Sequence, residues 1–209
     1  MSIMHSIIKA TLCATTLLFS ASVSAEDGKS PWLIRVRIID VVPDENSNTS
    51  IGGTVNVGDR FVPELDIVYF WSDHFATELI LATNSHNVGA TGTALGDLDL
   101  GKVSLLPPTL LAQYHFNPNG KLRPYIGAGI NYTFFYNADA GDLSSISYDD
   151  GFGYALQAGI DIGLDDNWAL NADIKKIFLD TEATINGGAA TANVDLDPWI
   201  FGFGLAYRF

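Results

Sequence analysis

The sequence has very little cysteine and very little positive charge, and each shortage excludes a class of protein. Its single cysteine, Cys13, lies near the N-terminus, which excludes a fold held together by several disulfides. Only 11 Lys and Arg stand against 24 Asp and Glu in 209 residues, for a net charge of −13. Proteins that bind DNA or RNA need clustered Lys and Arg to contact phosphates. We therefore expect no nucleic-acid partner.

The first 25 residues have the features of a secretory signal peptide. Lys9 gives a weakly positive start, residues 10–19 are mostly apolar, and Val23-Ser24-Ala25 supplies small residues for cleavage. We expect residues 1–25 to be removed during export to the periplasm, which leaves residues 26–209 without cysteine. A membrane anchor is the alternative, but the apolar stretch is shorter than the roughly 20 residues that a spanning helix needs.

Long hydrophobic runs are also missing from residues 26–209, which contain no uncharged apolar stretch of about 18 residues that would predict a transmembrane helix. The chain is nevertheless 47% hydrophobic, with 20 glycines, and is too apolar for a disordered segment. A closed β-barrel is the other structure that satisfies its backbone polar groups in lipid. If the chain lies in a membrane, it must therefore be a barrel.

Alternation of large and small side chains is the strongest pattern in the sequence. Every second residue from Trp199 to Phe209 is large and apolar, and a period of two also runs through residues 126–136 and 153–164. Such a period is typical of strands with one face toward lipid and one toward a crowded interior. The pattern predicts eight strands, at residues 32–42, 60–71, 75–84, 103–116, 122–137, 150–164, 167–180 and 194–209.

The connections between these strands alternate between short and long, as in outer-membrane barrels with short periplasmic turns and long external loops. The long ones cover residues 43–59, 85–102, 138–149 and 181–193. We predict an all-β, eight-stranded antiparallel transmembrane barrel of the outer membrane. A secreted β-sandwich or lipocalin-like barrel also alternates. Aromatic residues at strand ends, such as Trp71 and Trp168, favour the membrane barrel because they suit its interfacial girdles.

Three stretches in separate strands resemble the outer membrane protein W (OmpW) family: residues 106–114, 123–133 and 196–209. They include Leu106-Pro107-Pro108-Thr109, Arg123-Pro124-Tyr125-Ile126-Gly127-Ala128-Gly129 and Leu196-Asp197-Pro198-Trp199. The resemblance implies a small Gram-negative outer-membrane barrel associated with passage of small hydrophobic molecules. It also implies, for some members, roles as a surface receptor and in stress responses. The end of the last strand has the form of the signal recognised by the barrel assembly machinery, through Leu205, Tyr207 and Phe209.

The side chains that face inward in the predicted strands include many polar and charged residues. Eight strands enclose room for side chains or one small ligand, so these charges must pair. One interpretation is a plugged core in which Arg35 and Arg37 neutralise carboxylates, and the other is a narrow conduit lined by the same residues. The OmpW resemblance implies a rather apolar lumen, and the polar inward-facing residues of this sequence differ from that expectation. The candidate lumen residues are Arg35, Arg37, Glu64, Asp66, Glu78, Gln113, His115, Asn131, Gln157, Asp161, Asn171, Asp173 and Lys175.

Pro107 and Pro108 interrupt a predicted strand, where each removes a donor from the hydrogen-bond ladder. The interruption indicates either a kink near the rim or, as our hypothesis, a lateral exit through which an apolar solute leaves the lumen into the bilayer.

Acidic residues predominate in the long connections, where Lys102 is the only cation. They form either a solvated face or a surface that binds lipopolysaccharide through bridging divalent cations, for which carboxylates are suitable ligands. The nine acidic residues are Asp44, Glu45, Asp59, Asp97, Asp99, Asp139, Asp142, Asp149 and Glu182.

Catalysis has one weak candidate, His86 beside Ser85, because acyl-transfer chemistry needs a nucleophile with an adjacent base. We expect no enzymatic activity, no cofactor and no bound metal. The predicted function is passive passage of small hydrophobic molecules through a monomeric barrel in contact with outer-membrane lipid and lipopolysaccharide. The alternative is a non-conducting receptor whose external loops bind phage, toxin or host ligands.

Overall fold

The computed structural model describes residues 30–42, 46–49, 54–57, 60–93, 96–141, 144–188 and 190–209. The predicted signal peptide, residues 1–25 with Cys13, lies outside the described residues and stays a prediction. Among the described residues, no helix is long and apolar enough to cross a membrane.

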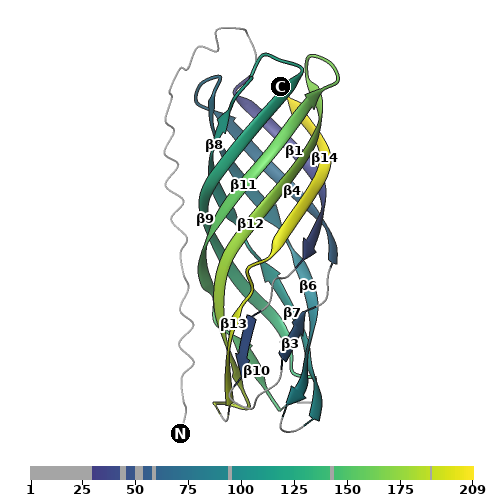
Figure 1. The fold of residues 1–209 in the computed structure, drawn as a ribbon, viewed down its shortest axis with the longest axis vertical. Coiled ribbons are helices and arrows are strands. Elements are labelled where there is room, and N and C mark those ends of the chain that lie inside the picture. The colour runs from purple at the N-terminus through teal and green to yellow at the C-terminus, as the bar shows by residue number, and fades with distance from the viewer. Residues whose placement is uncertain are drawn as a thin grey trace, which may run out of the picture.

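Eight antiparallel strands close into a ring, which confirms the predicted barrel (Figure 1). Each pairs with the next around the ring, and β14 pairs back with β1. Short turns at 71–74, 116–121 and 164–167 lie at the end that holds the C-terminus, which corresponds to the periplasmic side of outer-membrane barrels. The ring strands are β1 (Trp32–Val42), β4 (Arg60–Phe70), β5 (Phe75–Ala82), β8 (Thr109–His115), β9 (Leu122–Asp139), β11 (Gly151–Gly163), β12 (Trp168–Ile185) and β14 (Trp199–Arg208).

The other end of the barrel continues into a second region of paired strands. Much of what the sequence predicted as long loops is strand, because β9 and β12 run on past the ring and other segments pair with them. In Figure 1 this extension occupies the lower part of the view. Its shorter strands are β2 (Asn46–Thr49), β3 (Thr54–Val57), β6 (Asn84–Thr93), β7 (Gly96–Leu106), β10 (Ile146–Tyr148) and β13 (Ala190–Asp195).

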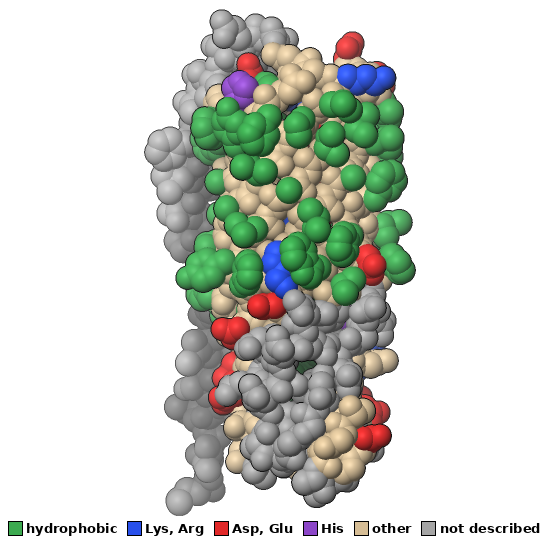
Figure 2. All heavy atoms as spheres, in the orientation of Figure 1, with side chains coloured by type: hydrophobic (Ala, Val, Ile, Leu, Met, Phe, Trp, Pro, Cys, Tyr) green, Lys and Arg blue, Asp and Glu red, His purple; other side chains and the backbone are tan. Residues whose placement is uncertain are grey.

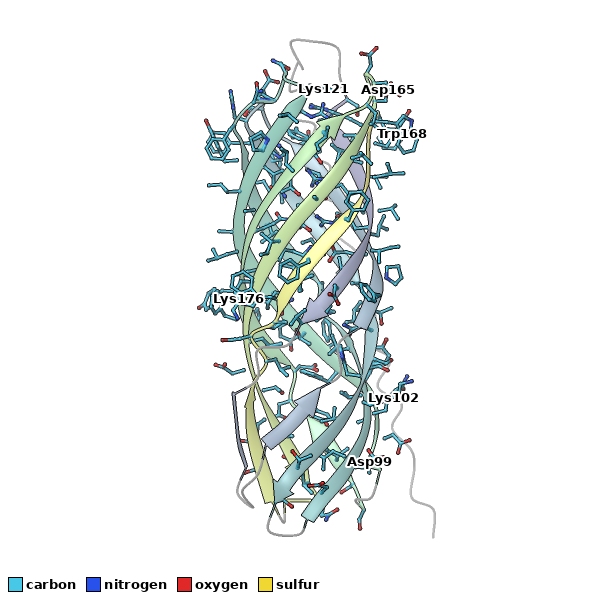
Figure 3. All side chains as sticks on the ribbon, turned by 45° about the vertical axis from the view of Figure 1, so that its right-hand side comes forward. Asp99, Lys102, Lys121, Asp165, Trp168 and Lys176 are labelled. Atoms are coloured by element: carbon cyan, nitrogen blue, oxygen red, sulfur yellow. The ribbon has the colours of Figure 1, made fainter. Side chains whose placement is uncertain are left out.

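An apolar band surrounds the ring strands, and acidic side chains become frequent beyond it, as Figure 2 shows for one face. At the short-turn end, Trp168 packs edge-on against Tyr207 at 4.8 Å between ring centroids, and Tyr207 packs against Phe209 at 5.0 Å. Lys176 lies near the middle of the molecule in Figure 3, with its Nζ 5.0 Å from the Trp199 ring. The band and its aromatic girdle match the lipid-facing surface expected of a membrane barrel.

The inward side chains of the ring form three layers, which can be followed along β1. From the short-turn end inward, β1 buries Leu33, then Arg35 and Arg37, then Ile39 and Val41. Because successive side chains of a strand alternate between faces, all five point into the lumen. We call the short-turn end the base of the lumen, so that "upper" and "above" mean toward the extension, which is drawn downward in Figure 1. The lumen has an apolar base, a charged middle layer and an apolar upper layer next to the extension.

Candidate functional site

The charged middle layer is held together by ion pairs that cross the lumen. The guanidinium of Arg35 lies 2.7 Å from Glu78 Oε1 and 2.8 Å from Asp161 Oδ2. Its face also lies 4.7 Å from the centroid of the Tyr125 ring. These partners come from β5, β11 and β9, so one side chain of β1 links strands from around the barrel wall.

Arg37 and Lys175 extend the same network toward the upper layer. Arg37 lies 2.6 Å from Asp66 Oδ2 and 2.6 Å from Asp173 Oδ2. Lys175 Nζ donates to Glu64 Oε1 at 2.8 Å and to Asp173 Oδ2 at 3.0 Å. Breaking one such buried pair leaves a charge without compensation, which makes the layer resistant to opening.

Amide and aromatic side chains fill the space between these charges. Gln113 Nε2 donates to Glu78 Oε2 and to Gln157 Oε1, both at 2.7 Å. Asn171 Nδ2 donates to Asp161 Oδ1 at 2.8 Å, and the His115 ring stacks on Tyr125 at 5.1 Å. Of the predicted lumen residues, all thirteen are buried in the structure, and twelve lie in or beside this layer. In the described part of the chain, the buried charged, amide and aromatic side chains fill the lumen at this level.

An apolar cavity of about 80 Å³ lies directly above the charged layer. Glu64 and Lys175 form part of its floor, and the rest of its lining comes mainly from aliphatic side chains of the ring strands and the start of the extension. The aliphatic and proline residues around it are Ile39, Val41, Ile80, Ala82, Leu105, Pro107, Ile177, Leu179, Leu196, Pro198 and Ile200.

The barrel wall beside this cavity has a stretch without strand pairing. Ile80 pairs with Thr109 and Asn84 pairs with Leu105, but no register pair joins residues 81–83 to residues 106–108. Pro107 and Pro108 occupy that stretch, and neither has an N–H to donate. We call it the wall gap. It separates β7 from β8, so the single strand predicted at 103–116 is wrong in this detail.

Side-chain hydrogen bonds form on the inner and the outer surface of the barrel wall at the wall gap. On the inside, Asn131 Nδ2 donates to Thr109 Oγ1 at 2.8 Å and to the Pro107 carbonyl at 3.2 Å, and these bonds fix the proline side of the gap to β9. On the outside, the Thr83 and Tyr136 hydroxyls lie 2.5 Å apart. Asn131, predicted as lumen lining, therefore belongs to the gap rather than to the charged layer.

The remaining predicted sites have separate positions. Leu205 and Phe209 are exposed on the outer surface, where an assembly factor can reach them. Ser85 and His86 are consecutive in β6 and so point to opposite faces, and Ser85 Oγ lies 2.7 Å from Ser104 Oγ. They do not form a nucleophile and base pair.

The acidic surface of the long connections is described only in part. Asp44, Glu45, Asp59 and Asp142 lie outside the described residues. Figure 3 places Asp99 and Lys102 on the extension, far from Lys121 and Asp165 at the other end. Within the part of the chain that is described, no group of three or more candidate ligands is placed to hold a metal ion.

Sequence reasoning missed the apolar upper layer, although a signal for it was present. Ile39 and Val41 are an even number of positions from Arg35 and Arg37 along the same predicted strand, and Ile177 is two positions from Lys175. In a strand, residues at such spacings point to the same face. Following every second residue along each strand therefore predicts an inward apolar surface above the charges. Asn84 was missed for another reason, because it was placed at the end of a strand rather than on the wall of a cavity.

Comparison with known proteins identifies the family. The model of the OmpW family matches residues 28–209. Outer membrane protein W of Vibrio cholerae serotype O1 is 35% identical, over 97% of this chain and all of the relative. A Pseudomonas aeruginosa protein named Dibenzothiophene metabolism operon protein PahQ is 29% identical, over 97% of this chain and all of the relative. The crystal structure of the outer membrane protein OprG from Pseudomonas aeruginosa superposes with a TM-score of 0.81 at 30% identity, covering 87% of this chain and 97% of OprG. The chain therefore belongs to the OmpW family of outer-membrane β-barrels.

Proposed function

We propose that this barrel, acting as a monomer without enzymatic activity, assists passive entry of small hydrophobic molecules and releases them sideways through the wall gap into the bilayer. The observation that carries the proposal is the position of the apolar cavity. It has the filled charged layer below it and the wall gap, with Pro107 and Pro108, beside it.

The physical chemistry of the two routes out of the cavity favours the lateral one. An apolar solute moving down the barrel axis would have to separate buried ion pairs such as those of Arg37, at a cost of several kcal/mol. A solute that leaves through the wall gap moves from the apolar cavity into the apolar interior of the bilayer and separates no ion pair. The lateral route therefore needs only a local rearrangement of the wall.

A relative supports the class of solute. The Pseudomonas aeruginosa protein is named for the metabolism of dibenzothiophene, which is an uncharged, fused aromatic molecule. Its similarity runs along almost the whole chain, including the segments that surround the cavity. A solute of this chemistry suits an aliphatic lining such as the one formed by Ile39, Ile177 and Leu179.

The test replaces both prolines of the wall gap and measures uptake of an apolar solute by cells. In a strain that otherwise lacks the protein, Pro107→Val with Pro108→Thr should reduce uptake to near the level without the protein, because it supplies two ladder donors and a regular strand. The matched control is Pro124→Val, at an exposed position of β9 away from the cavity, and it should leave uptake unchanged.

Two results would contradict the proposal. The first is unchanged uptake in the double variant when it is folded and present at the wild-type level. The second is a deletion strain with unchanged permeability to apolar solutes that has lost binding of a phage or another surface ligand. That second result would favour the receptor function over the passage function.

A further inference from the structure

The polar atoms around the apolar cavity are almost all engaged by other protein groups. Glu64 and Lys175 pair with each other at 2.8 Å. Asn131 joins Thr109 at 2.8 Å, and Thr133 Oγ1 donates to Asn131 Oδ1 at 2.8 Å. His86 also has an interaction of its own.

Asn84 is different, because its side-chain carbonyl oxygen is buried and has no hydrogen-bond partner in the described part of the chain. Asn84 begins β6 and lines the cavity at the upper edge of the wall gap, opposite Leu105. Pro107 and Thr109 line the cavity on the other side of the same gap. A solute that leaves through the gap therefore passes this acceptor.

A buried acceptor without a donor is uncommon in folded proteins, since it loses its hydrogen bonds to water without replacement. Here the surrounding surface is aliphatic, and Asn84 is itself one of the residues that line the cavity. That combination suits a ligand that is apolar over most of its surface and carries one O–H or N–H group.

We propose that Asn84 is a specificity-determining residue, which selects hydrophobic solutes bearing one hydrogen-bond-donating group, such as the hydroxyl of a phenol or alcohol or the amino group of a primary aromatic amine. The inference rests on the proposed passage function and names a preferred solute class for it. The Asn84 oxygen accepts the hydrogen bond of the solute, while the aliphatic lining contacts the ring or chain.

The experiment changes the solute and the protein in a two-by-two design. Uptake of 1-naphthol and 1-methoxynaphthalene, which share a ring system but differ in the donor, is measured in cells with wild-type protein and with Asn84→Leu. Naphthalene uptake serves as the reference without any oxygen, and cells lacking the protein give the background for each solute. The Asn87→Leu variant makes the same substitution at an exposed position of β6 outside the cavity lining.

After subtraction of the background, wild-type protein should favour 1-naphthol over 1-methoxynaphthalene by about threefold to tenfold, the range expected for one hydrogen bond. Asn84→Leu should remove this preference and leave naphthalene uptake at the wild-type level. Asn87→Leu should keep the preference.

The outcomes separate this inference from the proposed function. If wild-type protein raises the uptake of none of the three solutes above background, the passage function itself fails. If it raises all three but the ratio of 1-naphthol to 1-methoxynaphthalene is the same in Asn84→Leu, only the role of Asn84 is overturned. An equal loss of all three solutes in Asn84→Leu, with folded protein present, also overturns it, because the effect is then structural.

Discussion

The charged middle layer and the apolar upper layer of the lumen are built from the same ring strands with the same alternation of side chains, yet they differ in how far side chains fill the space. In the middle layer, Arg37 pairs with three carboxylates of two strands, and the space is filled. In the upper layer, Ile39 and Ile177 border free volume, and Asn84 keeps an unpaired acceptor. The filled part of the lumen and the part with free volume are therefore separated by height along one barrel, and the proposed passage function depends on that separation.

Removing one cation from the middle layer should have the largest effect on stability. Arg37→Met leaves Asp66, Glu64 and Asp173 without their shared partner, and losing one member of a buried ionic network costs about 3–5 kcal/mol. Urea unfolding in lipid vesicles measures the change in the free energy of unfolding. Lys121→Met, which removes an exposed cation in a turn, is the matched control and should change it by less than about 0.5 kcal/mol. Similar losses in the two variants would remove the contrast between the layers.

Shortening an aliphatic side chain of the upper layer should have a smaller effect on stability and a visible one on uptake. Ile177→Ala enlarges the cavity, and it should cost about 2 kcal/mol, the lower end for such substitutions, because the side chain already borders free volume. Uptake of bulkier apolar solutes should rise. Ile174→Ala lies on the other face of β12, outside the cavity lining, and should leave uptake unchanged. A loss above about 4 kcal/mol for Ile177→Ala would mean that the upper layer is packed as tightly as a normal core.

The sequence predicted which side chains face the lumen but not how they pair. The period of two places Arg35 and Asp161 inside independently of each other, since it depends only on neighbours along each strand. Their contact joins residues 126 positions apart and depends on the register of several strands around the ring. Strand register is set by turns and packing together, so the choice among five carboxylates could not be made from the pattern alone.

The position of the prolines was predictable, whereas the wall gap around them was not. Pro107 and Pro108 predict missing ladder donors from chemistry alone. The gap also requires that residues 81–83 form no register pair with residues 106–108, and that is a property of the assembled barrel. The extension escaped prediction for a similar reason, because its short strands are stabilised by pairing with the ends of β9 and β12.

The outer bridge across the wall gap should contribute less than either lumen layer. Tyr136→Phe and Thr83→Val each remove the hydrogen bond between the two hydroxyls, and each should lower the free energy of unfolding by less than about 1.5 kcal/mol. A double-mutant cycle should give a coupling energy of that size, because both substitutions remove the same hydrogen bond between the two hydroxyls. Solute uptake should rise in both single variants. Additive losses in the double variant, with unchanged uptake, would show that the bridge does not restrain the gap.

The smallest effect is expected at the short-turn end, far from both lumen layers, where Asp165 caps the turn between β11 and β12. Its Oδ1 accepts hydrogen bonds from the backbone N–H of Trp168 at 2.7 Å and of Asn167 at 2.9 Å, and these bonds hold the pKa of the Asp165 carboxyl below its usual value. The pKa of Asp165 is lower in the folded state than in the unfolded state. The stabilisation by this carboxylate is therefore fully present at pH values above its unfolded-state pKa, and it is lost as the pH falls through its folded-state pKa. Asp165→Ala should therefore destabilise the barrel slightly near neutral pH and not at all in strong acid, as measured by urea unfolding across a pH series. Asp166→Ala removes the neighbouring charge but neither of these hydrogen bonds, so an equal pH dependence in that variant would assign the effect to net charge instead of the cap.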